Sequence, residues 1–198
     1  LWLATSNGIS QLNITQSMFK FTPVFNKENN NLVGNQVNAL YSDKSNNIWL
    51  ATKKGVVVNY SNGTSETFSA NKNSGYLLVL DNINTVTGDN LGRIWIGSAG
   101  GINIWDPEAR KMHTITADFD INKGLRSNYI STFITPADGS FWVITWGGGM
   151  YKAKGNFADV DQIYFEYVAD FNTNLVSSDK NIWLEDKNKI YTIDLTTL

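Results

Sequence analysis

Five tryptophans recur along this chain at nearly constant spacing, and this repeat constrains the fold more than any other feature. The intervals are 47, 46, 47 and 41 residues, between Trp2, Trp49, Trp95, Trp142 and Trp183. Around each tryptophan stands an apolar residue on either side, then a polar or glycine turn, then a second apolar run. A period of this size is typical of repeat architectures such as solenoids and propellers.

The second repeat unit shows what one period contains. Apolar runs at residues 37–42, 48–52, 56–60 and 64–69 are separated by turns rich in Asp, Asn, Lys and Gly. Short runs bounded by turn-forming residues predict four β-strands joined by tight hairpins. The third and fourth units repeat this order. The first unit begins at its second strand, and the fifth stops after its third.

Two positions that follow each tryptophan support these hairpins. Six residues later stands a glycine in four units, which predicts a turn backbone of positive φ. Three residues later stands Thr or Ser in the same units, whose hydroxyl can bond the turn backbone. The glycines are Gly8, Gly55, Gly101 and Gly148, and the hydroxyl residues are Thr5, Thr52, Ser98 and Thr145.

The second strands are apolar on both faces, so both faces must be covered. In residues 48–52, Ile48 and Leu50 point one way while Trp49 and Ala51 point the other. Four-stranded sheets packed face to face around an axis cover both faces, and one tryptophan per sheet would fill each contact. A β-sandwich is the competing fold, but it gives no reason for a repeat of about 46 residues.

We therefore predict an all-β fold, a β-propeller built of four-stranded antiparallel blades. We expect residues 1–198 to form part of a larger propeller that has seven blades. In isolation, this part should expose apolar blade faces and associate. The expected blades are residues 37–69, 83–117 and 129–168, with partial blades at residues 1–21 and 173–195.

Composition excludes several classes of protein and site. The net charge of −2 gives no basic footprint for nucleic acid, and the absence of cysteine excludes disulfides and thiolate metal sites. There is no apolar run long enough for a membrane helix. The chain begins inside a repeat, so we expect it to be a segment of a longer protein.

Three stretches of the sequence resemble a known repeat. They are NQVNALYSDKSNNIWLATKKGVVV, INTVTGDNLGRIWIGSAGGINIWD and GLRSNYISTFITPADGSFWVITWGGGMYK. Each is similar to the two-component regulator propeller repeat, with Asn-x-Val in the first strand, Asp-x-x-Gly before Trp and Thr-x-x-Gly-Gly after it.

The resemblance implies the periplasmic or extracellular sensor part of an inner-membrane hybrid two-component receptor. Such a part would bind oligosaccharides derived from polysaccharides and signal to a kinase outside this segment, without catalysis of its own. The implied partners are the remaining blades and a downstream sensor domain of the same protein, together with a second copy of the full-length receptor. No cofactor is implied.

The alternatives are a propeller enzyme, either streptogramin-lyase-like or glycan-acting, and a pure protein-interaction scaffold. Catalysis needs a positioned acid, base, nucleophile or metal. The one histidine, His113, falls on an edge strand where a solvent-facing position is expected, and one imidazole builds no histidine metal site. Asp159, Asp161 and Glu166 lie in a long connection that we interpret as a solvated loop.

A recognition surface is the remaining candidate. The turns after the tryptophan strands and the connections before each first strand should meet on one face of the propeller. The candidate ligand-binding residues there are Lys53, Tyr76, Arg126, Asn128 and Trp146, with Lys54 beside them. Aromatic rings stack on sugar faces, and Arg or Lys can pair with sugar carboxylates or sulfates. The alternative for Trp146 is packing against the neighbouring blade. The turns holding Asp43, Asp89 and Asp138 are expected to be structural.

Overall fold

The computed structural model describes residues 2–5, 8–13, 18–22, 36–71, 76–117, 124–170, 175–177, 181–186 and 189–194. Within these residues the chain forms antiparallel β-sheets, turns and one short 3-10 helix, η1 (Val160–Gln162). None of the described helices is long and apolar enough to cross a membrane. The all-β prediction is confirmed.

Three sheets have four strands each and are named here by their order in the chain. Blade two contains β4 (Val37–Ser42), β5 (Ile48–Thr52), β6 (Gly55–Asn59) and β7 (Ser65–Phe68). Blade three contains β8 (Ile83–Gly88), β9 (Ile94–Ser98), β10 (Gly101–Asp106) and β11 (Lys111–Ile115). Blade four contains β12 (Ile130–Ile134), β13 (Trp142–Thr145), β14 (Gly149–Gly155) and β15 (Ile163–Ala169).

A three-stranded sheet flanks these blades on each side in the sequence. The first contains β1 (Trp2–Thr5), β2 (Gly8–Asn13) and β3 (Met18–Thr22). The last contains β16 (Leu175–Ser177), β17 (Asn181–Asp186) and β18 (Lys189–Asp194). Every sheet is a simple meander in which neighbouring strands are consecutive in the sequence.

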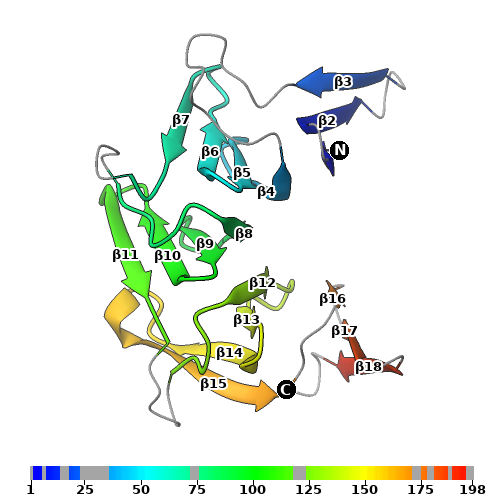
Figure 1. The fold of residues 1–198 in the computed structure, drawn as a ribbon, viewed down its shortest axis with the longest axis vertical. Coiled ribbons are helices and arrows are strands. Elements are labelled where there is room, and N and C mark those ends of the chain that lie inside the picture. Colours follow the sequence, from blue (N-terminus) through cyan, green and yellow to red (C-terminus); the bar gives the residue numbers. More distant parts are fainter. Residues whose placement is uncertain are drawn as a thin grey trace.

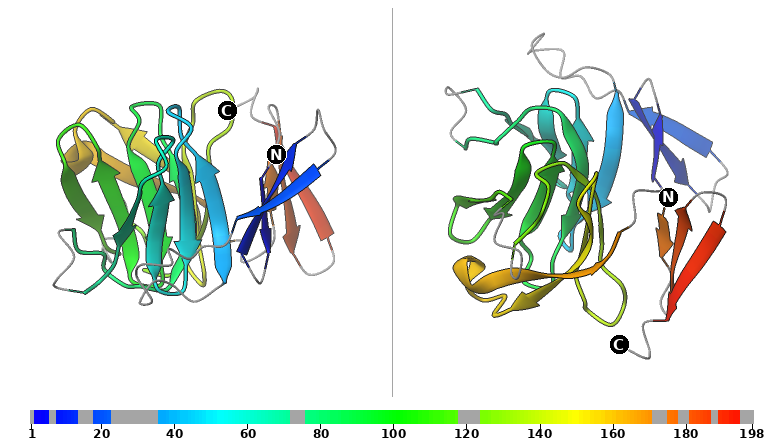
Figure 2. Two further views of the ribbon diagram at one scale, coloured as in Figure 1. Left: turned by 90° about the horizontal axis from the view of Figure 1, so that it is seen from above. Right: turned by 60° about the horizontal axis from the view of Figure 1, so that its bottom comes forward.

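The five sheets follow one another along an arc, with β4, β8 and β12 nearest the centre and β7, β11 and β15 on the outside (Figure 1). Both three-stranded sheets lie on the same side of the three blades (Figure 2). We call the side with the turns at 52–55, 98–101 and 145–149 the hairpin face. The opposite side, with the turns at 42–48, 88–94 and 134–142, is the Asp-turn face.

Neighbouring blades are joined at their innermost strands by a repeated bulge. The pairing of the first and second strands shifts register at Asn38 in blade two and at Asn84 in blade three. A bulged residue leaves the ladder and re-aims its side chain. The Asn38 amide donates to the Ile83 carbonyl of the next blade at 2.7 Å, and the Asn84 amide donates to the Ile130 carbonyl at 2.8 Å. The same hydrogen bond between neighbouring blades therefore recurs once per sequence repeat.

The tryptophans fill the contacts between blades. Trp49 packs with the apolar face of blade three, Trp95 with blade four, and Trp142 with Ile182 of β17. All three are at most 3% exposed. Trp183 differs, since 37% of its surface is exposed, and no described sheet follows it in the array.

The hairpin prediction is right for two glycines and wrong for a third. Gly55 has φ of 113° and Gly101 has φ of 130°, and each pairs with the hydroxyl residue three positions earlier. In blade four Thr145 pairs instead with Gly149, so the turn is one residue longer. Positive φ therefore falls on Gly147 and Gly149, not on Gly148. A Cβ on Gly148 would meet the Thr145 hydroxyl at 2.6 Å, so close packing requires glycine there.

Candidate functional site

The loop before β12 is bonded to the β13–β14 turn on the hairpin face of blade four. The Ser127 hydroxyl donates to the Trp146 carbonyl at 2.8 Å, and the Trp146 amide donates to the Tyr129 carbonyl at 2.8 Å. Below them the Tyr151 hydroxyl donates to the Gly148 carbonyl at 2.6 Å and accepts from the Arg126 amide at 3.0 Å. Burial raises the pKa of Tyr151, so this hydroxyl stays protonated and able to donate.

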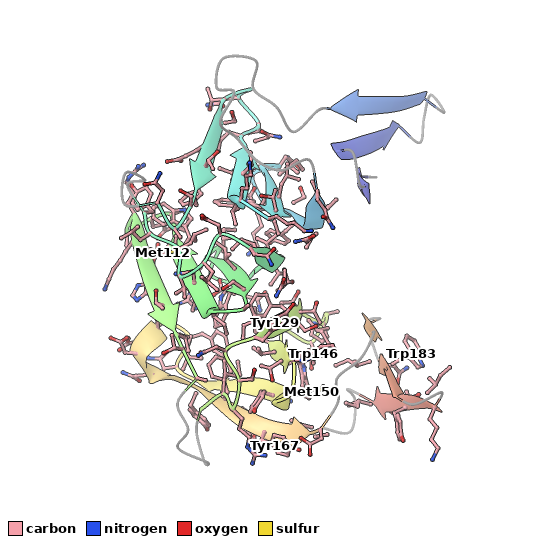
Figure 3. The ribbon with its side chains drawn as sticks, viewed as in Figure 1. Met112, Tyr129, Trp146, Met150, Tyr167 and Trp183 are labelled. Carbon is pink, nitrogen blue, oxygen red and sulfur yellow. The ribbon has the colours of Figure 1, made fainter. Side chains whose placement is uncertain are left out.

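This bonded loop presents an aromatic pair to solvent. Trp146 is 62% exposed and Tyr129 is 41% exposed, with ring centroids 6.3 Å apart (Figure 3). Packing of Trp146 onto a neighbouring blade, the alternative drawn from the sequence, is not what the structure shows. Large exposed aromatic rings held on a rigid scaffold suit ligand stacking.

Arg126, three residues before Tyr129 in the same loop, adds a cation to this face. Its guanidinium lies 4.1 Å from the ring centroid of Tyr167, a cation–π contact, while the residue remains exposed. The pKa of Tyr167 is raised by burial and by its hydrogen bond to Asp170, which keeps the ring neutral under the guanidinium. We call Arg126, Tyr129, Trp146 and Tyr167 the blade-four surface.

The other candidate residues from the sequence do not join this surface. Lys53 is exposed in the β5–β6 turn, two blades away on the same face. Asn128 has a structural contact, because its side-chain oxygen accepts from the Ala117 amide. Asp81, the equivalent residue before blade three, accepts from the Ala70 amide in the same way. These bonds tie the end of one blade to the start of the next.

Tyr76 lies elsewhere than predicted. Its ring packs 4.3 Å from the centroid of Trp105, and its hydroxyl accepts from Arg110 at 2.7 Å. Arg110 belongs to the β10–β11 turn on the Asp-turn face. The connection after blade two therefore packs its half-buried tyrosine against blade three and does not present it beside Arg126.

The Asp turns were expected to be structural, and the structure adds a bond to the blade tryptophan that the sequence did not predict. A carboxylate oxygen of Asp43 accepts from the indole of Trp49, and Asp89 accepts from Trp95, both at 2.9 Å. In blade four the Asp stands four residues before Trp instead of six, and Ser140 lies between the two side chains and bonds to both. The Trp142 indole donates to the Ser140 hydroxyl at 2.8 Å, which donates to Asp138. The signal in the sequence was the constant six-residue interval in blades two and three.

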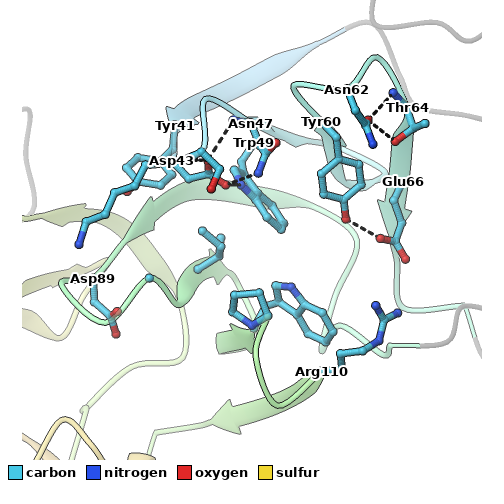
Figure 4. Close-up of a pocket in the computed structure, with 16 residues that line it drawn as sticks. Tyr41, Asp43, Asn47, Trp49, Tyr60, Asn62, Thr64, Glu66, Asp89 and Arg110 are labelled. Atoms are coloured by element: carbon cyan, nitrogen blue, oxygen red, sulfur yellow. Dashed lines mark hydrogen bonds between the residues drawn. The ribbon is translucent and has the colours of Figure 1, made fainter.

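A cleft opens on the Asp-turn face between blades two and three (Figure 4). Its volume is about 520 Å³, and it contains the exposed or half-buried side chains of Lys44, Tyr60, Asn62, Glu66 and Arg110. The buried rings of Trp49 and Trp105 lie at its base. We call it the interblade cleft. A neighbouring concavity of about 420 Å³ is lined by residues of blades two, three and four, among them the apolar Leu91, Pro136, Phe141 and Phe157.

The described residues contain no group of three or more His, Asp or Glu side chains placed to hold a metal ion. His113 is half-buried on β11 and lies in a shallow depression near Asp161. Asp159 caps η1 and Glu166 approaches Lys154 at 3.7 Å on an exposed edge, so each carboxylate has a local structural contact.

Comparison with known proteins supports the repeat and the fold. Residues 31–54 match the family model described as two component regulator propeller. No curated protein matches this sequence. The structure resembles the extracellular domain of a one component system from B. thetaiotaomicron, with a TM-score of 0.70 and 20% identity over 99% of this chain and 26% of that one.

Two further structures illustrate the range of proteins with this fold. A hybrid two component system extracellular domain from B. thetaiotaomicron gives a TM-score of 0.65 and 15% identity, over 99% of this chain and 32% of that one. Virginiamycin B lyase from Staphylococcus aureus gives 0.64 and 14% identity, over 98% of this chain and 63% of the enzyme. The chain thus spans 26% and 32% of the two receptor domains. At these identities the similarity establishes a propeller fold.

Proposed function

This chain carries a two component regulator propeller repeat, and on that basis we propose that it is part of the extracytoplasmic sensor region of a two-component receptor. Its role is to bind oligosaccharides released from polysaccharides and to pass the signal to a kinase elsewhere in the receptor. The remaining blades and a downstream sensor domain of the same protein are its structural partners. A second copy of the receptor completes the signalling unit.

The observation that carries the binding role is the exposure of Trp146, at 62% of its surface, in a turn bonded to the preceding loop. An exposed indole on a turn held by hydrogen bonds offers apolar area that a ligand can cover. Tyr129 lies beside it and Arg126 supplies a fixed positive charge. Two rings and one guanidinium match the chemistry of a sugar with an apolar face and an acidic substituent.

The main alternative is an enzyme, because a streptogramin-type lyase shares the fold. Lyase chemistry needs a positioned general base or a metal. The blade-four surface has no histidine or carboxylate among its four side chains, and the raised pKa of Tyr167 keeps that hydroxyl protonated. We therefore assign this segment to recognition without catalysis.

The test is equilibrium binding of the protein to a panel of neutral, uronate-containing and sulfated oligosaccharides by calorimetry. Trp146→Ala should weaken binding roughly ten- to a hundredfold, as loss of a stacking aromatic at a hot spot does. The control is Trp183→Ala, which removes a partly exposed tryptophan from a different sheet. Equal affinity of wild type and Trp146→Ala for every ligand that binds would contradict the proposal.

A further inference from the structure

The interblade cleft differs from the other blade contacts in the side chains that close it. In blade four, the turn after the third strand supplies Phe157, whose ring packs 6.3 Å from Trp95 and 6.4 Å from Phe141. In blade three, the turn after the third strand, between β10 and β11, supplies Arg110 to the interblade cleft. The interblade cleft is thus bordered by a guanidinium, whereas the contact between blades three and four is closed by an aromatic ring.

Arg110 is held in place at a conformational cost. Its backbone has φ of 50°, a left-handed conformation that side chains other than Gly, Asn and Asp adopt infrequently. Its Nε and Nη2 donate to the Tyr76 hydroxyl at 3.0 and 2.7 Å, and Tyr76 is itself packed on Trp105. Unusual backbone conformations that the surroundings maintain are concentrated at functional sites.

The opposite wall carries an anchored carboxylate. Glu66 lines the cleft, and the Tyr60 hydroxyl donates to one of its carboxylate oxygens at 2.6 Å (Figure 4). No ion pair within 4 Å joins Glu66 to Arg110 among the described residues. A cation and an anion therefore face one cavity without neutralising each other.

The other two carboxylates of the cleft, Asp43 and Asp89, already accept hydrogen bonds from the protein itself. Asp43 accepts from two backbone amides, the Asn47 amide and the Trp49 indole. Asp89 accepts from two backbone amides, the Arg93 side chain and the Trp95 indole. Their lone pairs are occupied, so Glu66 and Arg110 define what the cleft can recognise.

We propose that the interblade cleft binds a carboxylate-bearing sugar of about two units. Arg110 pairs with the carboxylate in a forked hydrogen bond, and Glu66 accepts the ring hydroxyls. Asn62 and Lys44 lie at its margins as further donors. The volume of about 520 Å³ lies within the range of small-molecule sites. The cleft is on the face opposite the blade-four surface, so it is a second site that stands independently of the first.

The test compares two probes that differ only in one carboxylate, cellobiouronic acid and cellobiose, by calorimetric titration of the protein. Wild type should bind the uronate about tenfold or more tightly than the neutral sugar, with a preference that declines as salt rises. Arg110→Asn suits the left-handed backbone while it removes the guanidinium, so it should fold normally and lose the preference. Glu66→Gln should weaken both sugars about tenfold. Lys111→Gln, which removes the neighbouring positive charge, should leave both affinities unchanged.

The outcomes separate this site from the proposed function. Loss of uronate binding in Trp146→Ala but not in Arg110→Asn would overturn the cleft and support the blade-four surface. If Lys111→Gln and Arg110→Asn reduced the preference for the uronate over cellobiose equally, the preference would arise from net charge alone. This result would also contradict the proposed cleft site. If the uronate did not bind the wild-type protein, the cleft proposal would be wrong. The proposal for the blade-four surface would still be decided by the Trp146→Ala experiment.

Discussion

At the scale of single residues, the same Asp–Trp bond stands in two different environments. In blade two Asp43 is half-buried and its neighbour four positions later is Asn47. In blade three Asp89 and Arg93 are both buried, at 8% and 5% exposure. Arg93 donates from Nε to Asp89 at 2.8 Å, and its Nη2 lies 2.7 Å away as an ion pair outside hydrogen-bond geometry.

Asp89→Asn should therefore cost much more stability than Asp43→Asn. The first change leaves a buried guanidinium without its counter-charge, which typically costs about 3–5 kcal/mol. The second weakens hydrogen bonds near the surface, for about 1 kcal/mol. Urea denaturation of both variants measures the difference. Equal costs would show that the Trp bond, common to both, dominates over the ion pair.

The Asp turns also predict how stability depends on pH. Burial tends to raise the pKa of Asp43, but hydrogen bonds from Trp49, Asn47 and Ser45 outweigh it and hold the pKa below the ordinary value of 3.8. The pKa of Asp138 is lowered likewise, because burial acts to raise it but the hydrogen bonds from Ser140 and the positive charge of Lys152 together outweigh that effect.

A lowered folded-state pKa means that the unfolded chain binds protons first. The stabilisation is complete above pH 3.8 and is lost as pH falls below that value towards the folded-state pKa. Asp43→Asn should flatten the decline of stability below about pH 4. Thermal melts of wild type and variant from pH 6 to pH 2.5 provide the measurement, and parallel curves would exclude this role of Asp43.

At the scale of elements, glycine matters where a hairpin meets its neighbouring strand. Gly55 combines φ of 113° with a position where an added Cβ would overlap the Phe68 carbonyl oxygen. Gly147 has φ of 73° but open space around it. Gly55→Ala should lose about 2–4 kcal/mol, and Gly147→Ala only about 1 kcal/mol, the cost of the backbone alone. Chemical denaturation compares them, and similar losses would mean that the strand clash relaxes.

The sequence predicted the repeated parts of these elements better than the variable ones. Spacing located the hairpin of Gly55 because its turn has the length common to blades two and three. It failed at Gly148 because the fourth turn contains one more residue, and a fixed offset cannot register an insertion. The role of Thr52 was predicted, and its hydroxyl donates to the Gly55 carbonyl at 2.8 Å.

The candidate site was predicted only in part for a similar reason. Trp146 was identifiable because it stands in a turn where the other units have polar or small residues. Tyr76 was misplaced because the path of a connection depends on what it packs against, here Trp105, and no period records that contact. The interblade cleft was missed because Glu66 and Arg110 are far apart in the sequence and belong to different units, and the period of the repeat does not record that they border one cavity.

At the scale of the whole molecule, each blade is stabilised by the next one along the arc. In such an array stability is close to a sum of unit and interface terms, so equivalent residues differ in importance with position. Trp95 is fully buried between blades three and four, whereas Trp183 is 37% exposed on the last sheet. The comparison of these two tryptophans measures what a following blade contributes.

Trp95→Ala should cost about 3–5 kcal/mol, as large-to-small changes of buried aromatic residues do, and Trp183→Ala less than about 1 kcal/mol in the 198-residue chain. The hypothesis that the propeller has seven blades adds a second expectation. In a longer protein with a blade after residue 198, Trp183 should become an interface residue and its substitution should approach the cost at Trp95. Denaturation of both variants in both lengths of chain decides the matter. A small cost for Trp183→Ala in the longer protein would mean that no blade packs on this sheet, and the seven-blade arrangement would then be wrong.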